Sequence, residues 1–561
     1  MIAMHDLQPN ELQERLKKLH RDGEERAAER LAGQLGLTYT DLSKVPVSLD
    51  AVRIVSEEDA RNAKAASIEI KGNRLALGVV DPDLPAAKKL IADLTEKKYE
   101  VKTIVISPAS LESAWHFYQF IKPEADVITG TVKIAKERLE TLRARLTTID
   151  AVHKEIASSD LKKLSPVTLI EIILAGAMGM RASDIHTEAE EKKAKIRFRI
   201  DGLLHDMFDD VPLATYQSFV SRIKLLSGMK LNVRDIAQDG RFTIALGEKE
   251  VEMRVSVIPA EFGETIVMRI LDPSATMVGL PDLGLRPDSL VIVKKQLARP
   301  NGLILNTGPT GSGKTTTLYA FLRTINNPEI KIITLEDPIE YRIEGIEQTQ
   351  VADESGYTFA NGLRAIVRQD PDVILVGEVR DLETADIAMQ AALTGHLVLS
   401  TLHTNDAVGA VPRLINLGVK AVSIGPALTL VIAQRLVRVL CKECKKKKEA
   451  DAPLTANIKK FLSRLPAKVD KKNYQAYELY EAVGCPQCNG LGYKGRIGIF
   501  EFLEGGPDLE TTILKEASEV ALREVAQKQE MVTMQQDGIL KALAGTTTLS
   551  EVESVTGEIE W

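Results

Sequence analysis

The chain has 561 residues, of which 44% are hydrophobic and 27% are charged. This is the composition of an ordinary globular protein, and at roughly 100–200 residues per domain the length predicts several domains. The formal net charge of −7 gives the chain no general attraction to nucleic acid or to anionic lipid.

We expect a cytoplasmic protein that reaches a membrane only through partners. The start of the chain lacks the basic-then-apolar pattern of a secretory signal. The longest uncharged apolar stretch, 421–433, contains Pro426 and is shorter than the about 20 residues that a membrane-spanning helix needs.

The first third of the chain is predicted to hold a docking domain and a linker. Leucines at helical spacing among charged residues in 8–32 indicate a surface helix. Apolar runs then alternate with helical stretches, which predicts an N-terminal α/β docking domain over 1–122. Residues 123–160 are polar and rich in Lys, Arg and Glu, and are predicted to be a helical linker.

A second α/β domain is predicted over 161–272. It begins with an apolar helix at 167–180 and continues with four strand-like runs, at 194–200, 242–246, 251–257 and 265–271. The prolines and glycines of 273–285 predict a flexible linker.

From 286 to 503 the pattern becomes strand–helix alternation. Four nearly continuous apolar runs, 303–306, 332–335, 373–376 and 397–402, predict a parallel sheet that is buried on both faces. Residues 504–561 are predicted to form a C-terminal helical region without chemistry of its own.

A phosphate-binding loop lies between the first apolar run and a helix. Residues 308–315 have the pattern G-x-x-x-x-G-K-T, in which backbone N–H groups and a helix N-terminus bind phosphate oxygens. Lys314 is expected on the β- and γ-phosphates of ATP and Thr315 on Mg²⁺. The expected nucleotide-binding residues are Gly308, Pro309, Thr310, Gly311, Ser312, Gly313, Lys314, Thr315 and Thr316.

Carboxylates follow two of the other strands. Glu378 comes after the run 373–376 and is expected to act as the catalytic base or to hold the Mg²⁺-bound water. Glu336 and Asp337 end another strand and are expected on the metal side of the phosphates, because acids beside a phosphate site repel unless cations face them. His403 ends the strand 397–402 and is expected to sense the γ-phosphate.

Four cysteines form two C-x-x-C pairs, Cys441 with Cys444 and Cys485 with Cys488. Two such pairs predict a closed tetrahedral Zn²⁺ site with a structural role, in a subdomain over 441–495. Redox chemistry is the alternative, but neither pair follows a thioredoxin-like strand.

These motifs together resemble the secretion ATPase superfamily, in particular its type II secretion and type IV pilus assembly members. The resemblance rests on the phosphate loop, on the acidic box 333–338, on the run 368–381 that contains Glu378, and on the histidine box 394–405. It is strong over 160–503 and weak over the N-terminal domain.

The resemblance implies a ring of six subunits that drives assembly of a pilin or pseudopilin fibre. It implies a RecA-like ATPase domain preceded by a PAS-like domain, whose Arg254 and Arg269 would act on phosphates, while Arg364 and Arg368 match the acidic-box region. It also implies an inner-membrane platform or docking partner. A retraction motor would lack the tetracysteine segment, and a DNA-transfer ATPase is disfavoured by the acidic balance; both remain alternatives.

Overall fold

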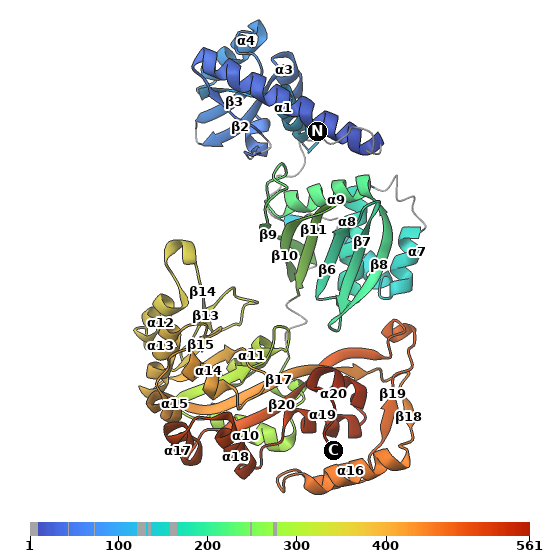
Figure 1. Ribbon diagram of the computed structural model, residues 1–561, viewed down its shortest axis with the longest axis vertical. Coiled ribbons are helices and arrows are strands. Elements are labelled where there is room, and N and C mark those ends of the chain that lie inside the picture. The colour runs from blue at the N-terminus through green and yellow to red at the C-terminus, as the bar shows by residue number, and fades with distance from the viewer. Residues whose placement is uncertain are drawn as a thin grey trace, which may run out of the picture.

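The computed structural model describes residues 9–120, 131–132, 136–157, 165–246, 249–272 and 278–561, apart from the single positions 43, 46 and 72. Three bodies follow one another along the longest axis in chain order (Figure 1). Within the described part of the chain, no helix combines the length and apolarity that crossing a bilayer requires.

The N-terminal domain is a four-stranded sheet with helices around it. The strand order is β1-β4-β3-β2, with β1 (Thr38–Tyr39), β2 (Ala65–Lys71), β3 (Arg74–Val79) and β4 (Glu100–Val105). The helices are α1 (Pro9–Leu35), α2 (Leu49–Val52), α3 (Glu57–Asn62), α4 (Pro85–Glu96) and α5 (Pro108–Trp115). Ser56 and Ser107 cap α3 and α5 by accepting backbone N–H groups, as serine does at helix starts.

The second domain is a seven-stranded sheet in the order β5-β9-β10-β11-β6-β7-β8. Its strands are β5 (Thr131–Val132), β6 (Asp184–Ala189), β7 (Lys193–Ile200), β8 (Leu203–Pro212), β9 (Gln238–Leu246), β10 (Lys249–Ala260) and β11 (Gly263–Leu271). Its helices are α6 (Lys136–Arg145), α7 (Ile149–Ala157), α8 (Pro166–Gly179) and α9 (Leu213–Leu226). The sequence pattern missed β6 and β8, because charged residues interrupt their apolar alternation.

Helices α6 and α7 lie within the stretch 123–160 that was expected to be a linker, yet they belong to the core of the second domain. Leu139 and Leu142 of α6 and Val152 of α7 share one buried cluster with α8. The close approach requires Gly179, because a Cβ there would lie 2.5 Å from the carbonyl oxygen of Leu146. The polar residues of the stretch lie mainly on the outer faces of these helices, and the apolar residues of the buried stripe were too few to change its composition.

The third domain is a seven-stranded sheet in the order β14-β13-β15-β16-β12-β17-β20, parallel except for the antiparallel pair β17–β20. Its strands are β12 (Gly302–Thr307), β13 (Ile332–Glu336), β14 (Glu347–Gln350), β15 (Val373–Val376), β16 (Leu397–Leu402), β17 (Leu428–Leu440) and β20 (Tyr493–Glu504). Its helices are α10 (Pro287–Leu297), α11 (Lys314–Ile325), α12 (Phe359–Val367), α13 (Leu382–Leu393), α14 (Ala410–Asn416) and α15 (Ala421–Ala427).

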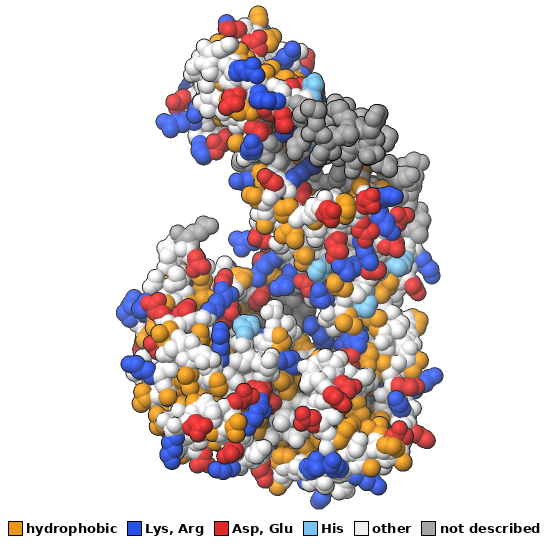
Figure 2. Space-filling model, in the orientation of Figure 1, with side chains coloured by type: hydrophobic (Ala, Val, Ile, Leu, Met, Phe, Trp, Pro, Cys, Tyr) orange, Lys and Arg blue, Asp and Glu red, His pale blue; other side chains and the backbone are white. Residues whose placement is uncertain are grey.

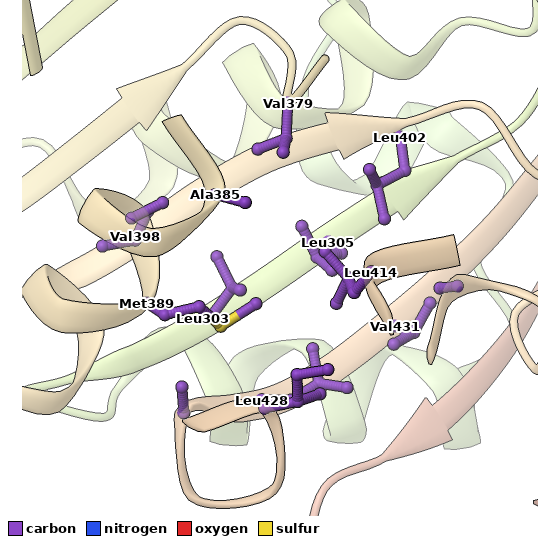
Figure 3. Packing of buried hydrophobic residues seen from close by; sticks show 14 of the residues in the cluster. Leu303, Leu305, Val379, Ala385, Met389, Val398, Leu402, Leu414, Leu428 and Val431 are labelled. Carbon is purple, nitrogen blue, oxygen red and sulfur yellow. The ribbon is translucent and has the colours of Figure 1, made fainter. Parts of the chain in front are cut away.

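Both faces of this sheet are buried, as the four apolar runs predicted. Leu303 and Leu305 of β12 belong to one hydrophobic cluster, whereas Ile304 between them belongs to another on the opposite face. Figure 3 shows the first cluster, in which Met389 of α13 and Leu414 of α14 lie over the strands. A strand buried on both faces cannot alternate with polar residues, which is why these runs are almost continuously apolar.

The cysteine segment is an excursion between β17 and β20, and it packs with the end of the chain. It contains β18 (Lys446–Lys448), α16 (Ala452–Arg464) and β19 (Leu479–Glu481); the chain ends with α17 (Pro507–Lys515), α18 (Glu519–Lys528), α19 (Met534–Leu543) and α20 (Leu549–Thr556). Ile458 and Phe461 of α16 share a buried cluster with Ile539 of α19 and Val552 of α20. The C-terminal helices therefore complete the cores of the third domain and of the cysteine segment.

Candidate active site

The phosphate loop joins the buried strand β12 to helix α11 and lies directly against β17. Gly308 and Gly313 have φ values of +151° and +87°. A Cβ on Gly308 would lie 2.6 Å from the carbonyl oxygen of Gln434, and a Cβ on Gly313 would lie 2.8 Å from the Nε2 atom of Gln434. Glycine is therefore required at both positions for backbone conformation and for space.

Gln434 of β17 supports the phosphate loop and lies outside every motif of the sequence. Its Oε1 atom accepts hydrogen bonds from Asn306 Nδ2 and from Thr317 Oγ1, each at 2.9 Å. Its side chain is buried, so these bonds fix the end of β12 and the first turn of α11 to the same point. The only signal in the sequence is a single amide within the apolar run of β17.

Lys314, the first residue of α11, bends back over the loop. Its Nζ donates to the carbonyl oxygens of Gly308 at 2.8 Å and Pro309 at 3.1 Å. Burial lowers the pKa of this ammonium group, and the charge of Arg435 lowers it further, while the charge of Glu378 acts in the opposite direction. The ammonium group of Lys314 therefore binds the loop carbonyls and is also stabilised by the charge of Glu378.

Glu378 follows β15 and is held between the side chains of Arg380 and His403. Arg380 donates to its Oε1 atom, and Nε2 of His403 lies 3.4 Å from its Oε2 atom. Burial alone would raise the pKa of Glu378, but the hydrogen bond and charge of Arg380, together with His403, outweigh it and lower the pKa. The structure therefore brings Glu378 and His403 together, from the ends of two adjacent strands.

The acidic box is divided between two environments. Glu336 is 3% exposed and accepts hydrogen bonds from Thr334 Oγ1 at 2.6 Å, Gln348 Nε2 at 3.2 Å and the hydroxyl of Tyr319. Burial raises its pKa. Asp337 is more exposed and lies 3.8 Å from Arg380. Of the two acids expected at the metal, only Asp337 shares a partner with Glu378; Glu336 faces α11 and β14.

Arg254 and Arg269 lie in one row across the sheet of the second domain. The strand register pairs Arg241 with Arg254, Arg254 with Arg269, and Arg269 with Asp184. Arg241 was not foreseen, because this row depends on the pairing of three strands that the sequence does not specify.

These arginines face the acidic box across an open cleft of about 1150 Å³, which Asp337 and Glu340 also line. Arg254 donates to Glu340 Oε2 at 3.0 Å and to the carbonyl oxygen of Ile339 at 2.6 Å, whereas Arg269 donates to Asp184 Oδ1 at 3.0 Å. Lys and Arg side chains gather along this junction of the second and third domains in Figure 2.

Two further arginines, Arg364 of α12 and Arg368 directly after it, are exposed. Arg364 forms an ion pair with Glu383. Among the described residues, neither of these arginines has a hydrogen bond or ion pair with the phosphate loop.

The four cysteines converge on one point. The Sγ atoms of Cys441, Cys444, Cys485 and Cys488 all lie within 4.8 Å of one another. The Cys441–Cys485 distance is 3.9 Å, and Cys444–Cys488 and Cys485–Cys488 are each 3.7 Å. Four thiolates at about 2.3 Å from a tetrahedral Zn²⁺ would be about 3.8 Å apart, so this donor set fits one metal ion.

Backbone groups support this arrangement of sulfurs. The N–H groups of Cys485 and Gly492 each donate to Cys488 Sγ at 3.2 Å. Such bonds stabilise thiolate charge and orient a ligand for its metal. The cluster can therefore hold one metal ion such as zinc.

In this parallel sheet the phosphate loop follows β12, and the carboxylate of Glu378 follows β15, which is separated from β12 by β16. A phosphate loop and a strand-end carboxylate in one such sheet define a P-loop nucleoside triphosphatase. The model of the Type II/IV secretion system protein family matches residues 160–554, and the chain belongs to this family. The MshEN domain model matches residues 35–119. The chain is therefore an ATP-hydrolysing enzyme of a secretion-type ATPase family with an additional N-terminal domain.

Relatives match nearly the whole chain. The type IV pilus assembly ATPase PilB of Myxococcus xanthus is 38% identical over 93% of this chain and 89% of its own length. The type II secretion system ATPase E of Vibrio cholerae is 41% identical over 84% of this chain and 95% of its own length. The X-ray structure of the Legionella pneumophila ATPase DotB has a similar fold, with a TM-score of 0.50 and 22% identity over 70% of this chain and 96% of that one.

Proposed function

We propose that this ATPase is a ring-shaped motor of six subunits that drives assembly of a pilin or pseudopilin fibre, in type IV pilus extension or type II secretion. The observation that carries the proposal is the pairing of a complete phosphate loop and Glu378 with a second domain whose arginines face the acidic box. Relatives named as pilus assembly and type II secretion ATPases match most of the chain and support the same conclusion.

Each residue of the site has a role in phosphoryl transfer to water. The loop N–H groups and Lys314 bind the phosphates, and the hydroxyl of Thr315 holds Mg²⁺. Glu378, kept ionised by Arg380, accepts the proton of the attacking water. His403 contacts Glu378 and reports whether the terminal phosphate is present.

The second domain couples hydrolysis to movement. Arg254 contacts Glu340 and Ile339 of its own chain in this structure. We propose that Arg254 leaves Glu340 and that the arginine row stabilises the charge of the phosphates bound to a neighbouring subunit. An arginine supplied in this way is worth about 10³–10⁵ in rate in other nucleoside triphosphatases.

The cysteine cluster holds Zn²⁺ in a structural role. All four positions are protein thiols, so the site has no open coordination position for substrate. Bound zinc would tie the excursion between β17 and β20 to its base, and the buried cluster with α19 and α20 would extend this support to the end of the chain.

The N-terminal domain is the proposed contact with an inner-membrane platform or docking protein. We propose that the motor works on the cytoplasmic side of that membrane and associates with it only through such partners. No nucleic acid is required as a partner.

A complementation experiment tests the motor function. In the source organism, deletion of the gene should abolish either surface fibres or secretion of proteins into the medium, and which of the two is lost identifies the fibre. The intact gene should restore the lost output, whereas Lys314→Ala, at equal protein abundance, should not. Restoration by Lys314→Ala would show that fibre assembly does not depend on hydrolysis at this site.

A further inference from the structure

The loop that carries His403 is anchored on both sides by polar contacts. Residues 403–407 follow β16 at its carboxyl end. On one side, the N–H of Thr404 donates to Thr307 Oγ1 at 2.8 Å, directly before the phosphate loop. On the other side, the N–H of Ala407 donates to Glu501 Oε1 at 2.7 Å. The loop that begins with His403 is therefore held between Thr307 of β12 and Glu501 of β20.

Strand register explains how a distant residue reaches this loop. In the sheet, Leu402 pairs with Thr307, Thr307 with Ala433, and Ala433 with Glu501. These four residues form one row across β16, β12, β17 and β20. Paired residues of adjacent strands project to the same face, so Glu501 and Thr307 act on the same side of the sheet.

Glu501 is a buried carboxylate with two backbone partners. It is 4% exposed, and its second oxygen, Oε2, accepts the N–H of Met534 at 3.0 Å. Met534 is the first residue of α19, where unpaired N–H groups and the positive end of the helix dipole favour a carboxylate. One side chain thus joins the histidine loop to the start of a C-terminal helix.

We propose that Glu501 is a positioning residue for hydrolysis, which fixes the 403–407 loop against α19 so that His403 meets Glu378. The proposal rests on the role of His403 proposed above. It assigns to the C-terminal helices a direct structural connection to the catalytic carboxylate, in addition to their packing role.

The charged surroundings fit this assignment. Burial raises the pKa of Glu501, the two N–H bonds lower it, and Asp406 and Arg523 act on it with opposite signs. Burial lowers the pKa of Arg435 of β17, and the charge of Glu501 acts in the opposite direction. Arg435 also donates to the carbonyl oxygen of Asn405 at 2.9 Å, within the same loop. Neither oxygen of Glu501 forms an ion pair with a described side chain, so its strongest contacts are the two backbone N–H groups.

The test is Glu501→Gln in the full-length protein, with phosphate release measured against ATP concentration. The amide keeps one acceptor and turns an NH₂ group toward the other backbone N–H, so one anchor is lost. We expect kcat to fall roughly tenfold while KM stays within about twofold, because the lost contact orients a group that acts in the transition state. Glu504→Gln on the same strand, whose partners are Lys295 and Gln296, is the matched control and should keep wild-type kcat.

A double-mutant cycle separates positioning from general stability. In a His403→Ala background, Glu501→Gln should cause no further loss of kcat, because its effect passes through His403. An equal loss in both backgrounds would overturn the role of Glu501 while leaving that of His403 intact. Wild-type kcat in His403→Ala alone would overturn the role of His403, and the proposal for Glu501 with it.

A second pair of variants covers the case in which Glu501→Gln does not fold. Proline is tolerated at the first position of a helix and has no N–H, so Met534→Pro removes the α19 partner of Glu501 and leaves Glu501 in place. Met534→Ala loses the same side chain but keeps the N–H. The proposal expects a severalfold lower kcat for Met534→Pro than for Met534→Ala, and equal values would overturn it.

Discussion

At the scale of single residues, the site separates two glutamates that look alike in the sequence. Both follow apolar strands, yet Glu378 is held by Arg380 and His403, whereas Glu336 is buried among neutral donors. The pKa of Glu378 is accordingly lowered and that of Glu336 is raised. A carboxylate that stays ionised can accept a proton from water, so we propose Glu378, rather than Glu336, as the base.

Replacing Glu378 tests this distinction. Glu378→Gln should lower kcat by about 10²–10⁴-fold while ATP still binds, because the amide keeps the shape and loses the proton acceptor. Since the folded-state pKa lies below the ordinary value, the carboxylate is ionised well before neutrality is reached. The ratio of wild-type to variant rates should therefore be the same at about pH 6 and about pH 8, measured by phosphate release.

The matched comparison is Glu336→Gln. It should act mainly on stability, since its side chain lies in a network with Tyr319 and Thr334 rather than beside Arg380. A larger loss of kcat in Glu336→Gln than in Glu378→Gln, with both proteins folded, would reverse the two roles.

At the scale of elements, local motifs were predictable and register was not. The phosphate loop, the acid after β15 and the two cysteine pairs each lie within one short stretch, so spacing alone predicted them. Gln434, Glu501 and Arg241 act through pairing between strands that are far apart in sequence. Periodicity gives the face of a strand but not its neighbours, so these residues could be found only in the structure.

The expected linker shows a second limit of sequence patterns. Composition described 136–157 as polar, yet Leu139, Leu146 and Val152 are fully or almost fully buried against α8. A short amphipathic helix contributes few apolar residues, so its buried stripe is hard to recognise in the sequence. The sequence pattern also does not indicate which helix it packs against.

Metal removal tests the cysteine excursion as an element. A strong chelator, or Cys485→Ser, should lower the stability of the segment that the site supports. A structural zinc site contributes on the order of 10 kcal/mol to folding in small zinc domains. Trp561 packs edge-on against Phe461 of α16, with 6.5 Å between the ring centroids. Both residues belong to the cluster that joins the excursion to the C-terminal helices. The fluorescence of Trp561 should shift on chelation, together with a lower melting temperature.

The second tryptophan of the chain, Trp115, lies in the N-terminal domain and gives an internal reference. In a Trp115→Phe background the shift should persist, and in a Trp561→Phe background it should vanish. An unchanged Trp561 signal and melting curve in protein shown to have lost its metal would contradict a structural role for the site.

At the scale of the whole molecule, the described residues form hydrogen bonds between the second and third domains in two regions. In one region Arg254 contacts Glu340 and Ile339, directly after the acidic box. In the other, Asp201 Oδ2 accepts the N–H of Gly495 at 2.8 Å and the N–H of Ile149 donates to Asn489 Oδ1 at 3.1 Å. The first region involves the arginine row and the second lies beside the cysteine excursion. A domain held at two points can release one and turn about the other, which is the kind of hinge movement that a motor requires.

Subunit mixing tests whether the arginine row serves a neighbouring chain. Arg254→Ala and Lys314→Ala should each be nearly inactive alone, since one lacks the arginine and the other lacks the phosphate-binding lysine. In an equal mixture, roughly a quarter of subunit interfaces would join an intact phosphate loop to an intact arginine if subunits assort at random in a ring. Phosphate release should then exceed that of either variant alone.

The control places both substitutions in one chain. Mixing that double variant with Lys314→Ala restores no complete site, so the mixture should stay inactive at the same oligomer size, checked by light scattering. If Arg254→Ala and Lys314→Ala also stay inactive when mixed, although they co-assemble, Arg254 works on its own chain. Its contact with Glu340 would then belong to the catalytic state, and the movement of the second domain would have to be driven by another contact.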